Sequence, residues 1–214
     1  MKRKISYLFT AFILITFYYC GNNNDSGKIE PPNLDLHSAI YMRDLEAIKQ
    51  HIKAGSDINV QENFLKSTPL ITAAALDEPE AAKLLIDAGA KINYQNMDGS
   101  TALITAAALG KTNTAKVLID AGADLNIQNN EGSTALITAA FLCNTEIVKA
   151  LLEKGADKTI LNKRGSTAYD GVKSSFEDVK PIYDVINEGF KKLGIELDYE
   201  HIKNTRPLIA EMLK

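Results

Sequence analysis

A short sequence pattern recurs along this chain at an almost constant interval of 33 residues. Thr68, Thr101, Thr134 and Thr167 stand at that spacing. Glycines keep nearly the same interval, at Gly55, Gly89, Gly122 and Gly155. A fixed period of this size is typical of a stacked solenoid, in which no unit buries its apolar face alone. The repeat therefore predicts a stack of similar units rather than a globular domain with one central core.

The cleanest unit runs from Ser100 to Asn126, S-T-A-L-I-T-A-A-A-L-G-K-T-N-T-A-K-V-L-I-D-A-G-A-D-L-N. Thr101 is the expected N-cap of a short apolar helix, as are its counterparts in the other units, and Gly110 ends that helix. A second, amphipathic helix follows and closes at Gly122. The polar stretch 124–132 then predicts an extended, hairpin-like loop that leads into the next unit.

The other units depart from this pattern at the turn between their two helices. Arg43, Asp77 and Cys143 stand where the third unit has Gly110. We expect backbone strain at these positions if φ is positive there, and least at Asp77. Cys143 is interpreted as a small space-filling residue rather than a reactive thiol, since no group beside it in the sequence would lower its pKa. The first loop, between Ile58 and Phe64, is one residue longer than the others.

Two motifs in register resemble those of the ankyrin-repeat family. The T-P-L-H-x-A-A element corresponds to residues 68–74, and the G-A-D-x-N element to residues 122–126. The resemblance covers about residues 36–171 and is specific because several motifs recur in register. It implies an all-α ankyrin-repeat solenoid of helix-turn-helix pairs with hairpin-like loops. We expect about five repeats, including capping units.

One family residue is mostly absent from this chain. The histidine of T-P-L-H normally joins neighbouring loops by hydrogen bonds, and only His37 retains it. Isoleucine replaces it at Ile71, Ile104 and Ile137. We therefore expect weaker ties between repeats, or ties taken over by the next residue in each unit, Thr72, Thr105 or Thr138.

Four segments are predicted from these patterns: residues 1–19, a signal peptide or N-terminal membrane anchor; 20–34, a flexible tether; 35–194, the ankyrin-repeat domain; and 195–214, a C-terminal helical cap. A long helix is expected over residues 176–193, with Pro181 near its start or at a kink. Its apolar face comprises Val179, Ile182, Val185, Ile186 and Phe190. A final amphipathic helix is expected after Pro207. We interpret the tail as a lid over the last repeat, and a partner-binding peptide is the alternative.

The N-terminus resembles a bacterial lipoprotein signal. Lys2, Arg3 and Lys4 precede an apolar run from Ile5 to Tyr19, and Cys20 follows. As a helix the run is about 22 Å long, against about 30 Å of hydrocarbon in a bilayer. These features fit a signal cleaved before a lipid-modified Cys20 better than a membrane span.

The residues before that cysteine depart from the lipoprotein pattern. The usual pattern has Leu and then two small residues, and the bulky residues Phe17, Tyr18 and Tyr19 occupy these places. An uncleaved signal anchor is the alternative, with Tyr18 and Tyr19 at the membrane interface. In both cases the repeats lie outside the cytoplasm, at the bacterial cell envelope. They would face the periplasm or the cell surface.

Composition and spacing argue against other functions. The net charge is -3, and -6 without the first nineteen residues. An acidic solenoid lacks the concentrated basic surface that nucleic acid requires. The three histidines, His37, His51 and His201, form no metal-binding spacing with one another or with Cys143. The glycines occur singly and build no phosphate-binding loop. We therefore expect no catalysis, no metal, no cofactor and no nucleic-acid partner.

The family resemblance implies a protein-binding function, with contacts at loop tips and on the concave face of the first helices. Carried over, the candidate positions are Phe64, Leu65, Leu76, Met97, Asp98, Leu109, Asn130, Glu131, Phe141, Leu142, Lys163 and Arg164. For Leu76, Leu109 and Leu142, packing between helices is an equal alternative. The chain is accordingly predicted to be a monomeric protein-interaction module tethered to the envelope. Two alternatives are a periplasmic antagonist of a toxin or hydrolase, and a structural spacer on the cell surface.

Overall fold

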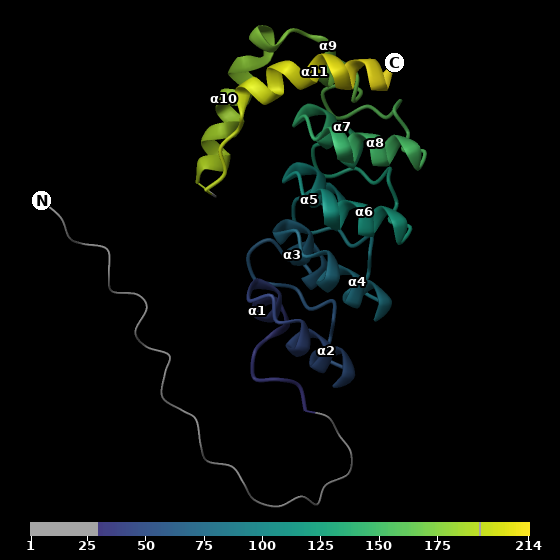
Figure 1. The fold of residues 1–214 in the computed structure, drawn as a ribbon, viewed down its shortest axis with the longest axis vertical. Coiled ribbons are helices and arrows are strands. Elements are labelled where there is room, and N and C mark those ends of the chain that lie inside the picture. The colour runs from purple at the N-terminus through teal and green to yellow at the C-terminus, as the bar shows by residue number, and fades with distance from the viewer. Residues whose placement is uncertain (1–29, 193) are drawn as a thin grey trace, which may run out of the picture.

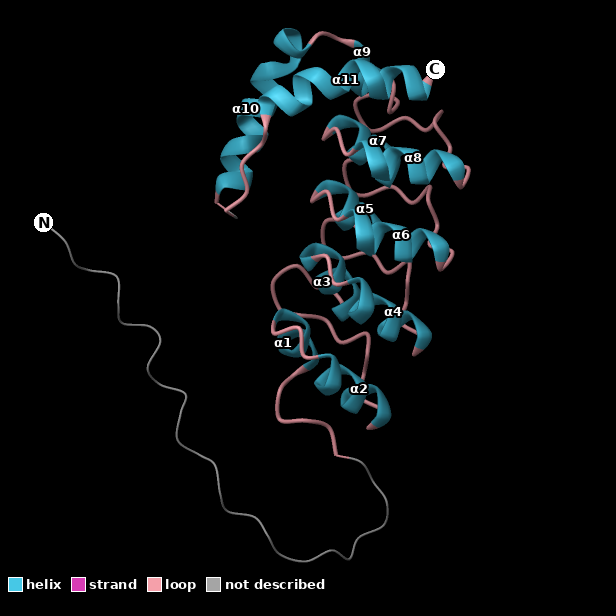
Figure 2. Cartoon of the chain, in the orientation of Figure 1, coloured by secondary structure: helices cyan, strands magenta, loops and turns pink. Residues whose placement is uncertain are grey.

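A computed structural model describes residues 30–192 and 194–214 of the 214-residue chain. Within these residues the chain forms eleven α-helices and no strand (Figures 1 and 2). The all-α fold class expected from the sequence is thereby confirmed. The expected signal peptide or anchor, with Cys20, lies outside the described residues.

Eight helices form four consecutive pairs that stack into an elongated array (Figure 1). In each pair a short first helix is followed by a second helix of nine residues. The pairs are α1 (Leu36–Tyr41) with α2 (Leu45–Lys53), α3 (Pro69–Leu76) with α4 (Pro79–Asp87), α5 (Ala102–Ala108) with α6 (Thr112–Asp120), and α7 (Ala135–Phe141) with α8 (Thr145–Glu153).

The repeated threonines begin the first helices in two ways. Thr101 and Thr134 each accept a hydrogen bond at 3.2 Å from the backbone N–H three residues on, as an N-cap does. Thr68 holds the same place but makes no such bond, and Pro69 occupies the first helical position instead. Thr167 accepts from the N–H of Asp170 at 3.2 Å, yet the fifth unit forms only the four-residue helix α9 (Asp170–Lys173). The expected N-caps at Thr101 and Thr134 are confirmed.

The turn between the two helices of each pair adopts the left-handed conformation that was expected. Arg43, Asp77 and Cys143 have φ of 57°, 57° and 61°, close to the 65° of Gly110. Asp77 also ties two repeats together, because its carboxylate accepts from both the backbone N–H and the hydroxyl of Thr114, at 3.0 and 3.1 Å. A residue with unfavourable backbone geometry thus contributes a contact that glycine could not make.

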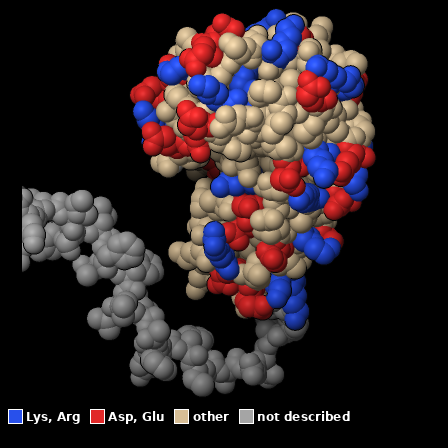
Figure 3. Space-filling model, turned by 45° about the horizontal axis from the view of Figure 1, so that its top comes forward, with Lys and Arg blue, Asp and Glu red and all other residues tan. Residues whose placement is uncertain are grey.

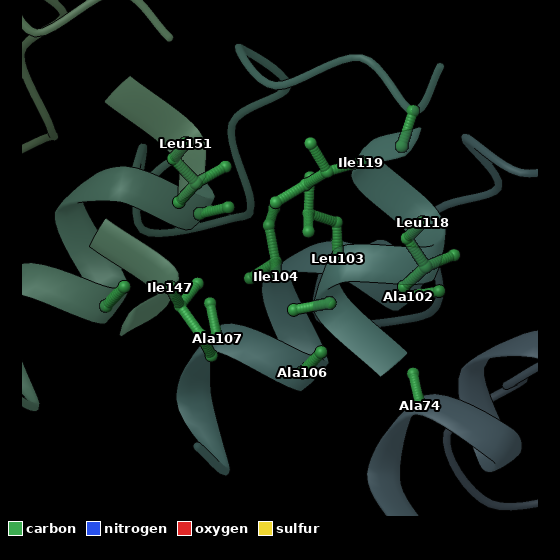
Figure 4. Close-up of a cluster of buried hydrophobic side chains, with 14 of the residues drawn as sticks. Ala74, Ala102, Leu103, Ile104, Ala106, Ala107, Leu118, Ile119, Ile147 and Leu151 are labelled. Carbon is green, nitrogen blue, oxygen red and sulfur yellow. The ribbon is translucent and has the colours of Figure 1, made fainter. Parts of the chain in front are cut away.

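Small and branched apolar residues form one core that runs the length of the stack. First helices approach closely because alanines fully buried at equivalent positions leave little side chain between them: Ala73, Ala74, Ala106, Ala107, Ala139 and Ala140. Each second helix adds a fully buried leucine or isoleucine, such as Leu118 and Leu151. Figure 4 shows these beside Leu103 and Ile104.

Glutamine side chains replace most of the missing histidine ties. His37 bonds to the hydroxyl of Thr72 at 2.9 Å and to the carbonyl of Val60 at 3.1 Å. Gln95 donates to carbonyls of its own loop and of the next, Gly99 at 2.7 Å and Gln128 at 3.0 Å. Gln128 repeats this arrangement one unit later, with Gly132 and Leu161. In the described part of the chain, Thr105 and Thr138 make no side-chain bond, so the expectation that they take over these ties is wrong.

The C-terminal end closes with two long helices, α10 (Phe176–Lys191) and α11 (Tyr199–Leu213). From here on, the cap means these two helices together with the short helix α9, on which α11 packs. Helix α11 lies across the end of the stack, where it packs on α7, α8 and α9 and buries Ile202, Ile209 and Leu213 (Figure 1). It begins earlier than the sequence suggested, because the Asp198 carboxylate caps it by accepting from the N–H of His201 at 2.9 Å. Pro207 therefore lies inside the helix rather than before it.

Helix α10 runs back along the side of the stack on which the first helices lie (Figures 1 and 2). Within residues 30–192 and 194–214, no helix has both the length and the apolar content that crossing a membrane requires.

Candidate functional site

Helix α10 presents an apolar face that is not covered by the rest of the chain. Pro181, Ile182, Val185 and Ile186 share one side of it, four residues apart in pairs. Val185 is 75% exposed and Ile182 39%. The apolar face is predictable from the sequence, whereas its exposure is not.

Two buried polar side chains attach α10 to the last full repeat and to the segment that leads into α11. The hydroxyl of Tyr183 donates to the backbone carbonyl of Phe141 at the end of α7. One turn later, Asn187 accepts from the backbone N–H of Leu197 at 2.9 Å. Tyr183 and Asn187 thus form the buried side of α10, and its apolar face lines the adjoining cavity.

A cavity of about 560 Å³ lies between α10 and the concave side of α7. Its walls come from these two helices, from the loops at residues 129–133 and 162–167, and from Gly171 of α9. We call it the α7–α10 groove. The side chains that line it include Ile137, Phe141 and Leu142 of α7, and Pro181, Ile182, Val185 and Ile186 of α10. In Figure 3 a recess separates the overhanging C-terminal end from the repeats below it.

The rim of the groove is held by two turns of the same construction. Asn129 accepts from the backbone N–H groups of Glu131 and Ser133, at 3.0 and 2.9 Å. Asn162 does the same for Arg164 and Ser166, at 2.9 and 3.1 Å. The loops are also joined by a backbone bond of 3.0 Å, from the N–H of Lys163 to the carbonyl of Glu131. Such turns hold the loop backbone in one conformation.

Charges of opposite sign stand at this rim. Glu131 and Arg164 both line the groove, and neither forms an ion pair in the part of the chain that the structure describes. The interior is mainly apolar. Over the face seen in Figure 3, acidic and basic side chains are interspersed. The groove therefore combines an apolar floor with one charge of each sign at its mouth.

An aromatic and cationic cluster supports the groove from behind. The Tyr183 ring stacks on Phe141 with centroids 4.7 Å apart and an interplanar angle of 17°. Arg206, 1% exposed, donates to the Tyr183 hydroxyl at 2.8 Å and to the carbonyl of Ser174 at 3.1 Å. Burial raises the pKa of Tyr183 well above its usual value, so the phenol stays neutral and can donate to Phe141.

Cys143 lies in the same region and is chemically inert. Its side chain is fully buried, and burial raises its pKa to about 11. Its sulfur lies 3.7 Å from the carbonyl of Ile202, to which the thiol donates. A protonated and inaccessible thiol fills space, as the sequence analysis proposed.

The candidate residues from the sequence fall into four places. Glu131, Phe141, Leu142 and Arg164 come together in the α7–α10 groove. The exposed residues Phe64, Leu65, Met97 and Asp98 lie on the loops of the first two repeats. Leu76 and Leu109 are half-buried at the ends of the first helices α3 and α5, and Leu76 packs against the core. Asn130 and Lys163 are exposed at loop tips.

Phe141 has a double role that changes what its substitution would report. It lines the groove, but it also stacks on Tyr183 and packs against the core. Replacing it would therefore disturb the cap as well as the groove surface. For that reason Phe141 is a poor probe of binding, and Val185 is a better one.

Two exposed residues at the other end of the concave face were missed. Tyr41 and Met42 are 65% and 69% exposed at the end of α1. They occupy the register of Ala75 and Leu76 in the next repeat. Aligning the first unit on that register would have found them, but the polar residues around Tyr41 made the unit look like a simple cap.

The described residues contain no group of three or more His, Cys, Asp or Glu side chains that could hold a metal ion. The groove itself offers one carboxylate, one guanidinium and a largely apolar surface. These are the components of a binding surface.

Comparison with known families agrees with this architecture. The family model described as ankyrin repeats (3 copies) matches residues 36–129 and 79–162. Together these matches cover more than half of the chain, which therefore belongs to the ankyrin-repeat family. Ankyrin repeats serve as protein–protein interaction modules. A search of curated proteins found no match.

Proposed function

We propose that this protein is a non-catalytic interaction module, tethered to the bacterial envelope, that binds a protein partner in the α7–α10 groove. The observation that carries the proposal is the exposed apolar face of α10, opposite the concave end of α7. Val185 is 75% exposed and lies in the wall of the groove. An apolar surface kept open in this way is typical of a binding site.

The shape of the groove favours an inserted segment of a protein. Its apolar lining suits two or three large apolar side chains, and its rim offers Glu131 and Arg164 to polar groups on either side. Along the concave face, Leu109 and Thr105 are half-buried and continue the surface toward the earlier repeats. A partner segment anchored between α7 and α10 can therefore extend along the stack.

The tether is supported by the N-terminal sequence. Three basic residues, an apolar run over residues 5–19 and Cys20 stand in the order of a bacterial lipoprotein signal. Replacing Cys20→Ser tests it. We expect the variant to leave the membrane fraction if lipid on the cysteine is the anchor. A variant that stays membrane-bound would show that residues 5–19 remain as an uncleaved anchor.

The groove is tested with the full chain as bait for partners from the envelope. Val185→Asp places a charge on the apolar wall without touching the core, and should reduce partner recovery about tenfold or more, equivalent to 1.4 kcal/mol. Leu208→Asp is the matched control, because Leu208 is 62% exposed on α11 and does not line the groove. Equal recovery by both variants would contradict the proposal. A single partner whose activity is blocked would identify the protein as an antagonist.

A further inference from the structure

The loop between the first and second repeats differs from the three that follow it. The later loops share an Asn-x-x-Gly turn, at residues 96–99, 129–132 and 162–165. In the first loop Glu62 takes the place of the asparagine and Lys66 that of the glycine, with one extra residue between them. Lys66 has φ of 56°, so the chain keeps the left-handed turn without glycine. We call residues 62–66 the first finger.

The first finger is held in one conformation by the side chain of Glu62. Its carboxylate accepts from the backbone N–H groups of Phe64, Leu65 and Ser67, at 2.5, 2.6 and 2.9 Å. These hydrogen bonds, first the one from Ser67, lower the pKa of Glu62. The carbonyl of Leu65 also accepts from the N–H of Met97 in the next loop, at 2.9 Å. A fixed loop thus presents Phe64, whose side chain is 83% exposed.

Exposed apolar side chains are concentrated in the first repeat and the two loops that follow it. Leu65 and Met97 are 36% and 61% exposed on the same loops as Phe64 and Asp98, and Tyr41 and Met42 are exposed at the end of α1. At the tips of the third and fourth loops the equivalent residues are polar: Asn130, Glu131, Lys163 and Arg164. The apolar character of the loop tips therefore falls from the first repeat to the last. Apolar groups held rigidly in water indicate a contact.

The sequence outside the described residues points to what that contact is. The described chain starts at Glu30, and the carbonyl of Leu34 accepts from the ring of His51 at 2.5 Å, so the chain enters beside α2 of the first repeat. Only the ten residues 21–30 lead from Cys20 to the start of the described chain. They span at most about 33–36 Å when extended. A chain anchored at or before Cys20 therefore keeps its first repeat close to the membrane.

We propose that the first finger, together with Met97, docks on the interface of an anionic lipid membrane. This proposal rests on the membrane tether proposed above. Phe64 and Leu65 would enter the interfacial layer, where aromatic side chains are favoured, and Lys66 would meet lipid phosphates. Lys66 forms no ion pair within the described part of the chain. The α7–α10 groove lies at the opposite end of the stack, so the docked protein presents it away from the membrane (Figure 1).

The test uses a property of the sequence, which contains no tryptophan. Phe64→Trp places one fluorophore at the tip of the first finger, and Leu161→Trp places one at the far end as a matched control, since Leu161 is 55% exposed. Each full-length variant is reconstituted into vesicles of phosphatidylethanolamine and phosphatidylglycerol, with and without bromine on the acyl chains. Flotation of the vesicles reports separately whether the chain is tethered.

We expect F64W emission to shift to the blue and to be quenched by brominated lipid, while L161W emission does neither. The quenching of F64W should weaken when phosphatidylglycerol is replaced by a zwitterionic lipid, or when Lys66→Gly removes the ammonium group. Equal quenching of F64W and L161W in floating vesicles would overturn the membrane contact and leave the tether intact. A blue shift without bromine quenching would place the finger against protein and also overturn it. Chains that do not float would overturn the tether and this proposal together.

Discussion

The repeats and the C-terminal cap are stabilised by different means. In the stack from α3 to α8, the same small residues recur at the same places, and each repeat contacts its neighbours through buried alanines. In the cap, a cluster of Phe141, Tyr183 and Arg206 joins α10 and α11 to each other and to α7. Repetition distributes stability over many similar contacts, whereas the cap depends on a few large side chains. The α7–α10 groove lies at the boundary between these two regions.

The largest effect should come from removing the centre of the cap cluster. Tyr183→Ala deletes the ring that stacks on Phe141 and the hydroxyl that Arg206 donates to. A substitution of this size in a core costs about 3–5 kcal/mol. Urea denaturation gives the total loss, and hydrogen exchange locates it. Exchange should accelerate in α10 and α11 and stay unchanged in α3 to α6.

Two control variants, Tyr183→Phe and Tyr41→Ala, show which part of this loss comes from the buried ring. Tyr183→Phe keeps the ring but leaves a buried carbonyl and part of Arg206 without a partner, which should cost about 1–3 kcal/mol. Tyr41→Ala, at a tyrosine that is 65% exposed, should change little. Equal acceleration of exchange along the whole stack in Tyr183→Ala would contradict the distinction between repeats and cap.

Overpacking the stack should have the next largest effect. Ala106 has no exposed surface and lies where α5 meets its neighbours. Ala106→Leu enlarges the side chain there and should lower the free energy of unfolding by about 1–3 kcal/mol. In contrast to the cap variant, exchange should accelerate in α3 and α7 as well as α5, because each first helix packs on the next. Ala108→Leu in the same helix is the control, since Ala108 is only half-buried. A loss confined to α5 would show that the repeats are more independent than the contacts indicate.

Relieving backbone strain in the first finger should have a smaller effect of opposite sign. Lys66 is exposed with φ of 56°, a conformation that costs a side-chain-bearing residue about 1 kcal/mol. Lys66→Gly should therefore raise the free energy of unfolding by up to about 1 kcal/mol. Gly110→Ala is the opposite change and should lower the free energy of unfolding. The alanine would have to keep φ of 65°, and its Cβ would lie 2.9 Å from the Asn144 side chain. Thermal denaturation of both variants measures these effects, and a destabilised Lys66→Gly would contradict the strain.

The smallest effect concerns acid stability of the cap. The Lys173 ammonium, followed by hydrogen bonds from Thr167, holds the pKa of Asp170 at about 2 instead of 3.8. A carboxyl with a lowered folded-state pKa stabilises the fold above its unfolded pKa, and this contribution is lost as pH falls from about 4 to 2. Asp170→Asn should weaken the pH dependence of unfolding in that range, measured by chemical denaturation. The effect should be small because the pair is largely exposed. An unchanged pH profile would exclude Asp170 as a contributor.

The repeats were predictable from the sequence because one local pattern recurs several times along the chain. The 33-residue period identified the helix pairs, the N-caps at Thr101 and Thr134, and the positions where Arg43, Asp77 and Cys143 adopt positive φ. The hydrogen bonds that Gln95 and Gln128 donate between loops were not predicted, because these residues do not stand at the position where the family has histidine. These glutamines also recur at the repeat interval, so the signal was present.

The cap and the groove were less predictable because they depend on contacts without a period. Pro207 suggested a helix start, but the helix begins earlier, at its N-cap Asp198. Nothing in the local sequence shows which of these two residues starts the helix. The pairing of Tyr183 with Arg206 joins two helices that the sequence does not orient. The apolar face of α10 was visible in the sequence, whereas the exposure of Val185 follows only from where α10 lies.

Partner binding in the α7–α10 groove is tested most directly by photo-crosslinking in the cell. A photoreactive amino acid replaces Val185 in one full-length chain and Leu208 in another, both exposed on cap helices. We predict a defined crosslinked product from position 185 and none from position 208, because only the first lines the groove. A product from position 208 alone, or the same product from both positions, would contradict the groove as the binding site.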